Sequence, residues 1–337
     1  MMGQLLFAAA IFVGAVALTA WVRKYAIKAQ LLDLPNHRSS HTLPTPRGGG
    51  LSIVVTSLLA AVGLWAAGKV DTGLMLAFVG GGASIAVVSF MDDKGSVPVR
   101  TRFAVHFLAA VWSLYWLGGL PPLLVGERLI DLGWIGHVLA VIGLVWALNL
   151  FNFMDGIDGL AGSEAACIGL LAGGLAFAFE HGSGASLLAI CLGMGALGFL
   201  VWNWPPAKIF MGDVGSGYLG FVIAVLAIAD ARANPVALFV WQILAGVFFA
   251  DATVTLLRRW RRGERVHEAH RSHAYQWLSQ RWNSHSRVTL AVLAVNLGAL
   301  LPCAAVAFRY PQFAGWLALL VTVALGLLAL RCGAGQS

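Results

Sequence analysis

Aspartates recur where apolar segments of this 337-residue chain begin or end. Asp92 and Asp93 follow one apolar run, Asp155 and Asp158 close a second in the stretch NLFNFMDGIDGL, and Asp213 opens a third. A carboxylate at the centre of a bilayer costs roughly 2.5–3.5 kcal/mol, so an acidic residue beside a membrane segment calls for a function. A single one of these residues can be explained as a helix cap. Five carboxylates at the ends of three segments favour a shared site for a hard cation such as Mg²⁺.

Composition identifies the chain as an integral membrane protein. Hydrophobic residues make up 59% of it and charged residues 11%, whereas soluble domains contain roughly 25% charged residues. Its apolar runs are long enough to cross a bilayer as helices, which predicts an all-α, polytopic helical bundle with about eleven transmembrane helices. No second domain or internal repeat is evident, so residues 1–337 are expected to form one domain. The predicted spans are 3–22, 48–67, 72–91, 103–118, 134–153, 159–179, 184–203, 215–230, 235–257, 288–308 and 312–331.

The basic residues predict the orientation of this bundle. When the loops are assigned to alternate sides, one side holds 18 Lys and Arg residues and the other holds only Lys69, Arg128, Arg232 and Arg309. Basic residues favour the cytoplasmic side, so the N-terminus is predicted to be periplasmic and the C-terminus cytoplasmic. All five aspartates then face the cytoplasm. The net charge of +7 follows from this topology and from anionic lipid headgroups, and nucleic-acid binding is not expected.

Two cytoplasmic loops carry further polar residues. Residues 33–50 include Arg38, His41 and Arg47 and end in three glycines, which either form a tight turn or bring backbone N–H groups close to an anion. The longest loop holds His267, His270 and His273, three residues apart and beside Arg271. No cysteines or carboxylates with zinc-site spacing accompany the histidines, so an anion-binding or acid–base role is favoured over a zinc site.

These motifs together resemble the polyprenyl-phosphate N-acetylhexosamine-1-phosphate transferases. DLPNHRSSHTLPTPRGGG, FMDD, NLFNFMDGIDGL, PAKIFMGDVGS and HRSHAYQ occur in the family's order and span nearly the whole chain. The family includes the bacterial enzymes that start O-antigen, enterobacterial common antigen and teichoic acid chains, and phospho-N-acetylmuramoyl-pentapeptide transferase. The resemblance implies an enzyme of the bacterial inner membrane. It would use Mg²⁺, or Mn²⁺ as the alternative, to transfer a sugar 1-phosphate from a UDP-N-acetylhexosamine to undecaprenyl phosphate, releasing UMP.

The resemblance also implies roles for individual residues. Asp92 and Asp93 would hold the metal or accept the proton of the lipid phosphate, and Asp92, nearer the membrane, is expected to face the buried site. Asp213, Asp93 and Asp155 would bind the metal, while His270 and His273 would complete the catalytic set. The substrate-binding residues would be Asn152, Asp155, Asp158, Arg100, Arg38, His41, Arg47, Lys208 and Arg271.

Several alternatives to this function stay open. The peptidoglycan enzyme has a run of adjacent histidines where this chain has HRSHAYQ, which favours an O-antigen initiator that transfers an N-acetylglucosamine, N-acetylfucosamine or N-acetylquinovosamine phosphate. A transporter is the main rival of another class, although transporters place polar groups near the midplane. A catalytically inactive scaffold is a further rival, which the complete set of aspartates argues against. The bilayer, the UDP-sugar and the polyprenyl phosphate are the expected partners, and a homodimer is left open.

Overall fold

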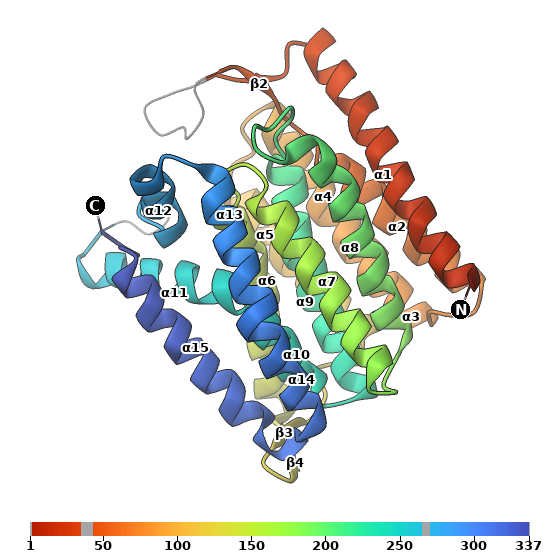
Figure 1. Ribbon diagram of the computed structural model, residues 1–337. Helices are drawn as coiled ribbons and strands as arrows, with labels where there is room; N and C mark the ends of the chain where they lie inside the picture. Colours follow the sequence, from red (N-terminus) through yellow and green to blue (C-terminus); the bar gives the residue numbers. More distant parts are fainter. Residues whose placement is uncertain (1, 35–42, 265–269, 337) are drawn as a thin grey trace.

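The computed structural model describes residues 2–34, 43–264 and 270–336. Most of the described chain is helical, and the long helices pack side by side in a single bundle (Figure 1). The helices are α1 (Met2–Lys28), α2 (Leu51–Ala66), α3 (Thr72–Leu76), α4 (Gly82–Lys94), α5 (Val99–Trp116), α6 (Gly133–Met154), α7 (Leu160–Ala178), α8 (Gly184–Asn203), α9 (Asp213–Ala233), α10 (Ala237–Leu244), α11 (Gly246–Arg261), α12 (Ala274–Trp282), α13 (His285–Val295), α14 (Leu301–Arg309) and α15 (Ala314–Arg331).

Helices occupy every one of the eleven predicted spans. A π-helical turn, Ala77–Gly81, joins α3 to α4, and a second, Asn296–Leu300, joins α13 to α14. Within the described ranges, eight helical segments are long and apolar enough to cross a membrane, and the bent pair α10–α11 would make nine. The protein is therefore a multi-pass helical membrane protein. The count of eleven, which adds α2 and α5, and the orientation of the termini remain predictions.

Helix α9 forms the centre of the bundle. It contacts α2, α4, α6, α7, α8 and α10, and nearly all of its residues are buried. Glycines permit this crowding: a Cβ atom on Gly220 would lie 2.1 Å from the carbonyl oxygen of Ala147 in α6. Small residues of this kind let membrane helices approach backbone to backbone. The loop before α9 is thereby held close to the ends of its neighbours.

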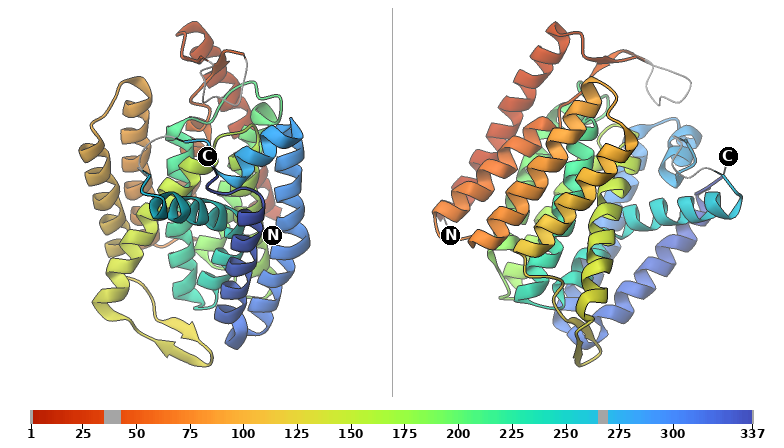
Figure 2. Two further views of the ribbon diagram at one scale, coloured as in Figure 1. Left: turned by 90° about the vertical axis from the view of Figure 1, so that its left-hand side faces the viewer. Right: turned by 180° about the vertical axis from the view of Figure 1, so that it is seen from behind.

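The predicted span 235–257 is not one straight helix. It is divided at Ala245 into α10 and α11, which meet at an angle of 69°. Helix α11 runs across the other helices and ends in Arg258, Arg259 and Arg261 (Figure 2). The predicted span is therefore helical but bent, and the sequence gives no proline or charge at the bend to mark it.

Two short antiparallel ribbons accompany the helices, which an all-α prediction did not include. Strand β1 (Leu32–Asp33) pairs with β2 (Thr45–Pro46), and β3 (Leu123–Val125) pairs with β4 (Arg128–Ile130). The two ribbons lie at opposite ends of the bundle (Figure 1). The ribbon β1–β2 leads into α2 at the end where α6 and α8 finish and where α7 and α9 begin.

Candidate active site

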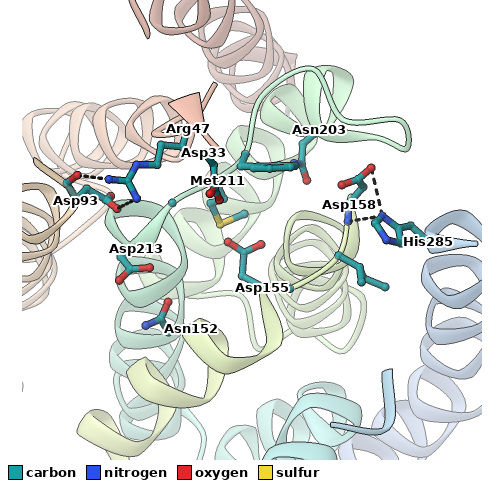
Figure 3. Close-up of a pocket in the computed structure, with 14 residues that line it drawn as sticks. Asp33, Arg47, Asp93, Asn152, Asp155, Asp158, Asn203, Met211, Asp213 and His285 are labelled. Carbon is teal, nitrogen blue, oxygen red and sulfur yellow. Dashed lines mark hydrogen bonds and ion pairs between the residues drawn. The ribbon is translucent and has the colours of Figure 1, made fainter. Parts of the chain in front are cut away.

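A polar pocket of about 260 Å³ lies where these helix ends meet. Its walls come from β1, the segment before α2, the end of α4, the last turn of α6, the α6–α7 connection, the α8–α9 connection and the first residue of α13 (Figure 3). Loops far apart in the sequence therefore converge, as the recurring aspartates predicted. The lining residues are Asp33, Arg47, Asp93, Asn152, Asp155, Gly156, Ile157, Asp158, Asn203, Phe210, Met211, Gly212, Asp213 and His285.

Asp155 and Asp213 face this pocket without a hydrogen-bond or ion-pair partner among the described residues. Asp155 directly follows α6, and Asp213 is the first residue of α9. No described residue donates a hydrogen bond to either carboxylate. Burial raises the pKa of Asp155 well above its usual range, and the charges of Asp213, Asp158 and Asp93 raise it further. Carboxylates in this position repel one another unless a proton or a cation separates them.

Asp93, rather than Asp92, lines the pocket. Asp92 accepts a hydrogen bond from the backbone N–H of Val97 at 2.8 Å and is ion-paired with Arg102. Asp93 Oδ2 accepts a bond from the backbone N–H of Val214 at 3.3 Å, and its Oδ1 lies 3.9 Å from Nη1 of Arg47. The expectation that Asp92 faces the buried site was wrong. Successive residues of a helix are rotated by about 100°, and this rotation points Asp92 toward α5 instead.

The glycine run before α2 packs against the segment before α9. The backbone N–H groups of Gly49 and Gly50 donate to the carbonyl oxygens of Phe210 and Met211, both at 2.9 Å. A Cβ atom on Gly50 would lie 2.4 Å from the Cα of Gly215. These two N–H groups are consequently not available to an anion, and the tight-turn interpretation of the run holds for them. The close packing fixes Asp213 opposite Arg47 and Asp93.

Asn152 and Asp158 also line the pocket, as the motif predicted. Asn152 Oδ1 accepts a hydrogen bond from Ser216 Oγ at 2.9 Å, which orients its amide nitrogen for donation. Asp158 Oδ2 accepts from the backbone N–H of Ala207 at 3.0 Å and lies 3.3 Å from Nδ1 of His285. Asp158 is thus tied to the opposite wall, whereas Asn152 presents a donor beside Asp213.

The histidines form a separate cluster behind the last turn of α6. His273 is 2% exposed, and its Nδ1 lies 3.3 Å from Oδ1 of Asp251, a residue of α11 that is 3% exposed. Asp251 also accepts from the backbone N–H groups of Ala274 and Tyr275, at 2.9 and 3.1 Å, and from the hydroxyl of Thr255 at 3.1 Å. Donation from Nδ1 to Asp251 leaves Nε2 as the ring nitrogen that can accept a proton.

His270 stacks on His273, with ring centroids 4.9 Å apart. Its Nδ1 is 2.9 Å from the hydroxyl of Ser272. Burial lowers the pKa of His270 to about 4, and the neighbouring His273 and Arg259 add to the decrease. His270 is therefore uncharged at neutral pH. Neither histidine lines the carboxylate pocket.

Tyr275 connects the histidine cluster to the pocket. Its hydroxyl donates to the carbonyl oxygen of Phe153 at 2.9 Å. A Cβ atom on Gly156, which lines the pocket, would lie 2.1 Å from the same hydroxyl oxygen. Gly156, the first glycine of the NLFNFMDGIDGL stretch, is consequently required for α12 to dock against the α6–α7 connection.

The remaining predicted residues lie outside the pocket. Arg100 is exposed in the first turn of α5, and Lys208 lies over the ring of Trp202 at 5.5 Å. Arg271 lines an adjoining cavity of about 410 Å³ that shares Asp158 and His285 with the pocket. Arg38, His41 and His267 lie outside the described residues. The structure therefore does not bring Arg100 or Lys208 to the pocket.

Comparison with known proteins identifies the family of this chain. Residues 75–230, which include Asp93, Asp155 and Asp213, match the sequence model of glycosyl transferase family 4. The chain is 31% identical to a probable undecaprenyl-phosphate N-acetylglucosaminyl 1-phosphate transferase of Bacillus subtilis, over 83% of this chain and 78% of that protein. The chain belongs to the polyprenyl-phosphate N-acetylhexosamine-1-phosphate transferase family.

Two other members of the transferase family extend the comparison. A decaprenyl-phosphate N-acetylglucosaminephosphotransferase of Mycolicibacterium smegmatis is 29% identical over 81% of this chain and 75% of its own length. A phospho-N-acetylmuramoyl-pentapeptide-transferase of Gluconobacter oxydans is 34% identical, but over 64% of this chain and 65% of its own length. The match to the N-acetylglucosamine enzymes thus covers more of the chain.

The carboxylate oxygens of the pocket suit a hard cation that a substrate also coordinates. Among the described residues, no three His, Cys, Asp or Glu side chains are close enough together to hold a metal by themselves. Mg²⁺ usually takes one or two carboxylates and completes its shell with water and substrate phosphates. The unpartnered oxygens of Asp155 and Asp213 fit that requirement, whereas the carboxylate of Asp251, which already accepts bonds from four residues, does not.

Four residues of this region were not predicted as site residues. Asp33, Asn203 and His285 line the pocket, and Asp251 anchors the histidines. Each of the first three adjoins a predicted span or polar loop, which was a usable signal. Asp251 lies inside an apolar run, where an acidic residue is itself the signal for a functional position.

Proposed function

We propose that this protein transfers an N-acetylhexosamine 1-phosphate from a UDP-sugar to undecaprenyl phosphate and releases UMP. The observation that carries the proposal is the pair Asp155 and Asp213, two carboxylates in one polar pocket to which no described residue donates a hydrogen bond. A reaction between two phosphate-bearing substrates needs such a pocket, because phosphoryl transfer depends on positioning and on neutralisation of charge. The names of the relatives support the polyprenyl phosphate acceptor and the N-acetylglucosamine phosphate group.

Asp155 and Asp213 would hold Mg²⁺, or Mn²⁺ as the alternative. A bound divalent cation would neutralise the negative charge of the diphosphate. Asn152 would orient the donor, because its Oδ1 is occupied by Ser216 and its amide nitrogen is left to donate. Arg47 would contribute positive charge at the same wall, where it is already held by Asp93.

Asp93 is the better candidate of the Asp92–Asp93 pair for contact with the lipid phosphate. Asp92 is neutralised by Arg102, whereas Asp93 lines the pocket. The second pKa of a phosphate monoester is about 6, so the attacking phosphate is largely ionised near neutral pH. Asp93 is therefore proposed to position the acceptor through Arg47 rather than to serve as an obligatory base.

An apolar cavity beside the pocket is suited to the polyprenyl chain of the acceptor. It has a volume of about 320 Å³ and lies between α11, α12, α13 and α15. Met154 lines this cavity, and the next residue, Asp155, lines the carboxylate pocket. A chain bound there would present its phosphate to the carboxylates.

The lipid cavity can be tested on a single helix. Ala291 of α13 lines the cavity, whereas Ala294, one turn away, is exposed and does not. Ala291→Phe should raise the KM for undecaprenyl phosphate and leave the KM for the UDP-sugar unchanged. Ala294→Phe should change neither. Equal effects of the two substitutions on both substrates would contradict the assignment.

The proposed site faces the cytoplasm of a bacterium from its inner membrane, where UDP-sugars are made. The proposed role is to start a lipid-linked O-antigen or related envelope glycan, with an N-acetylglucosamine, N-acetylfucosamine or N-acetylquinovosamine donor. Phospho-N-acetylmuramoyl-pentapeptide transfer is the second candidate, favoured by the 34% identity to such an enzyme. Against it stand the shorter match and the HRSHAYQ sequence in the last loop.

The decisive experiment is a donor panel. Purified protein with undecaprenyl phosphate and Mg²⁺ is given a set of UDP-N-acetylhexosamines and UDP-N-acetylmuramoyl-pentapeptide, and UMP release is measured. We expect one of the hexosamine donors to release UMP, and EDTA to stop the reaction. If no donor yields UMP or a lipid-linked sugar phosphate, the proposed function fails. Turnover of the pentapeptide donor alone would select the second candidate.

A further inference from the structure

A second polar cavity, of about 470 Å³, lies at the opposite end of the bundle. It is formed where α5 and α9 end and where α8 begins, so α8 and α9 connect it to the carboxylate pocket. The 21 residues of α9 separate the two sites by about 30 Å. The polar and aromatic residues that matter in its lining are Lys69, Asp71, Tyr115, Trp116, Ser183 and Arg232.

Basic residues are scarce at this end of the protein, and two of them meet in the cavity. The loops assigned to this side hold only Lys69, Arg128, Arg232 and Arg309. Lys69 and Arg232 both line the cavity, although they are 163 positions apart in the sequence. Neither forms an ion pair with an acidic side chain of the described residues. The cavity therefore brings together two positive charges that form no ion pair within the part of the chain that the structure describes.

Close backbone packing fixes the position of these charges. A Cβ atom on Gly118 would lie 3.1–3.4 Å from Nη1, Nη2 and Cζ of Arg232, so the guanidinium group rests against the backbone of this glycine. A Cβ atom on Gly184 would lie 2.5 Å from the carbonyl oxygen of Lys69. The end of α9, which carries Arg232, is thus packed against the segment that follows α5, and the loop with Lys69 is packed against the start of α8.

A buried carboxylate joins two of the elements that line the cavity, the start of α8 and the end of α9. Asp230 of α9 is 3% exposed and accepts hydrogen bonds from the hydroxyls of Ser183 and Ser186, at 2.6 and 2.9 Å. It also accepts one from Nε1 of Trp241 at 3.1 Å. The carboxylate is fully occupied by these neutral donors. It ties the start of α8 to the end of α9 and leaves Lys69 and Arg232 to act on a ligand.

The rim of the cavity has the composition of a membrane boundary. Tyr115 is 74% exposed and Trp116 is 36% exposed, both in the last turn of α5. Tyrosine and tryptophan are enriched at the level of lipid headgroups. Below them, the outer face of α5 exposes Leu108, Val111 and Trp112. A ligand with a polar head in the cavity could therefore lay its apolar chains along α5.

The cavity also contains one negative group. Asp71 accepts a hydrogen bond from the backbone N–H of Leu74 at 2.9 Å through Oδ1. None of the described residues donates to its second oxygen. Two cations and one carboxylate together match a headgroup that carries a phosphate and an ammonium group.

We propose that this cavity binds the phosphoethanolamine headgroup of a membrane glycerophospholipid. Lys69 and Arg232 hold the phosphodiester through charge-assisted hydrogen bonds, which are the stronger kind. Asp71 accepts the ammonium group, and Tyr115 and Trp116 cover the glycerol region. The site is independent of the proposed transferase reaction, since it lies at the other end of α9.

The test compares two double variants of the full-length protein. Lys69→Gln with Arg232→Gln removes both charges of the cavity. Arg128→Gln with Arg309→Gln removes the other two basic residues of the same end, which do not line it. Bound lipid is measured by native mass spectrometry after delipidation and titration with phosphatidylethanolamine, phosphatidylglycerol or inorganic phosphate. Thermal unfolding in lipid-free detergent checks that both variants are folded.

We expect the cavity variant to bind phosphatidylethanolamine about tenfold or more weakly, as follows from the loss of hydrogen bonds between charged partners. The control variant should bind like the wild type. Asp71→Asn should weaken phosphatidylethanolamine binding and spare phosphatidylglycerol. Equal lipid binding by the wild type and the cavity variant would overturn the proposal. So would binding of inorganic phosphate or phosphatidylglycerol in preference to phosphatidylethanolamine.

Discussion

Two kinds of carboxylate occur in the same bundle, and they differ in what neutralises them. Asp230 accepts bonds from three side chains, and Asp251 accepts from two backbone N–H groups, a hydroxyl and a histidine. Asp155 and Asp213 accept no hydrogen bond from the part of the chain that the structure describes, and they face other carboxylates. The first kind is satisfied when the protein folds. The second kind is neutralised only when a cation or a proton binds. A binding site is therefore recognised by carboxylates whose charge the protein does not neutralise, rather than by burial.

Asp213→Asn tests the unpartnered carboxylates and should have the largest effect on turnover. The substitution removes a charge that the protein does not neutralise, so we expect the rate of UMP release to fall by about 10³-fold, the scale for loss of one group that stabilises transition-state charge. The melting temperature should stay unchanged or rise, because repulsion is relieved and no accepted hydrogen bond is lost. Wild-type turnover would remove Asp213 from the proposed metal site, and a large fall in melting temperature would place it with the structural carboxylates.

Asp251→Asn should affect both turnover and stability. The amide would present a donor where the backbone N–H groups of Ala274 and Tyr275 now donate, and it would release His273 from its orientation. Misplacement of an aligned group by about 1 Å can cost about 10²-fold in rate, and we expect a loss of that order in kcat with little change in KM for the UDP-sugar. Asp251→Glu, which keeps the acceptor, should recover part of the rate. A variant that loses stability and keeps its kcat would restrict Asp251 to a structural role.

Asp230→Asn should destabilise the protein and spare the chemistry. Its new amide nitrogen would face either the hydroxyl pair of Ser183 and Ser186 or Nε1 of Trp241. A buried donor left unsatisfied costs about 1–3 kcal/mol, so the melting temperature should fall by several degrees while turnover per folded molecule stays constant. Asp71→Asn is the matched control, because it removes an exposed charge at the same end and preserves the cap. A reduced kcat in Asp230→Asn would show that this end of α9 is coupled to the pocket.

The sequence predicted the convergence of the aspartate loops because that depends only on which ends of the helices share a side. Asp93, Asp155, Asp158 and Asp213 do line one pocket. The choice between Asp92 and Asp93 could not be predicted, since one residue of difference rotates a side chain by about 100° around the helix. The family resemblance named both residues without deciding which of them faces the site.

Contacts between residues far apart in the sequence could not be predicted either. The anion-binding interpretation of the glycine run failed for Gly49 and Gly50 because their N–H groups pair with a segment about 160 positions away. The partnership of Asp251 with His273 depends on the 69° bend between α10 and α11 and on the return of α12. Neither the bend nor the return has a local signal in the residues that form it.

His270→Gln should have the smallest effect on stability, and that effect should be visible in the pH dependence. The folded protein keeps the pKa of His270 near 4, whereas the unfolded chain has an ordinary value of about 6.5. Between these values the unfolded state binds more protons, so acidification from pH 6.5 toward 4 destabilises the native state and a rise in pH restores it. Above pH 6.5 the ring is neutral in both states and contributes no pH dependence. The melting temperature of the wild type should therefore fall more between pH 7 and pH 5 than that of His270→Gln.

Glutamine can still bond to Ser272, so the two proteins should melt alike at pH 7.5. An identical pH dependence would mean that the stacked imidazoles are not desolvated. The contrast between carboxylates with and without hydrogen-bond donors would then not extend to the histidine cluster.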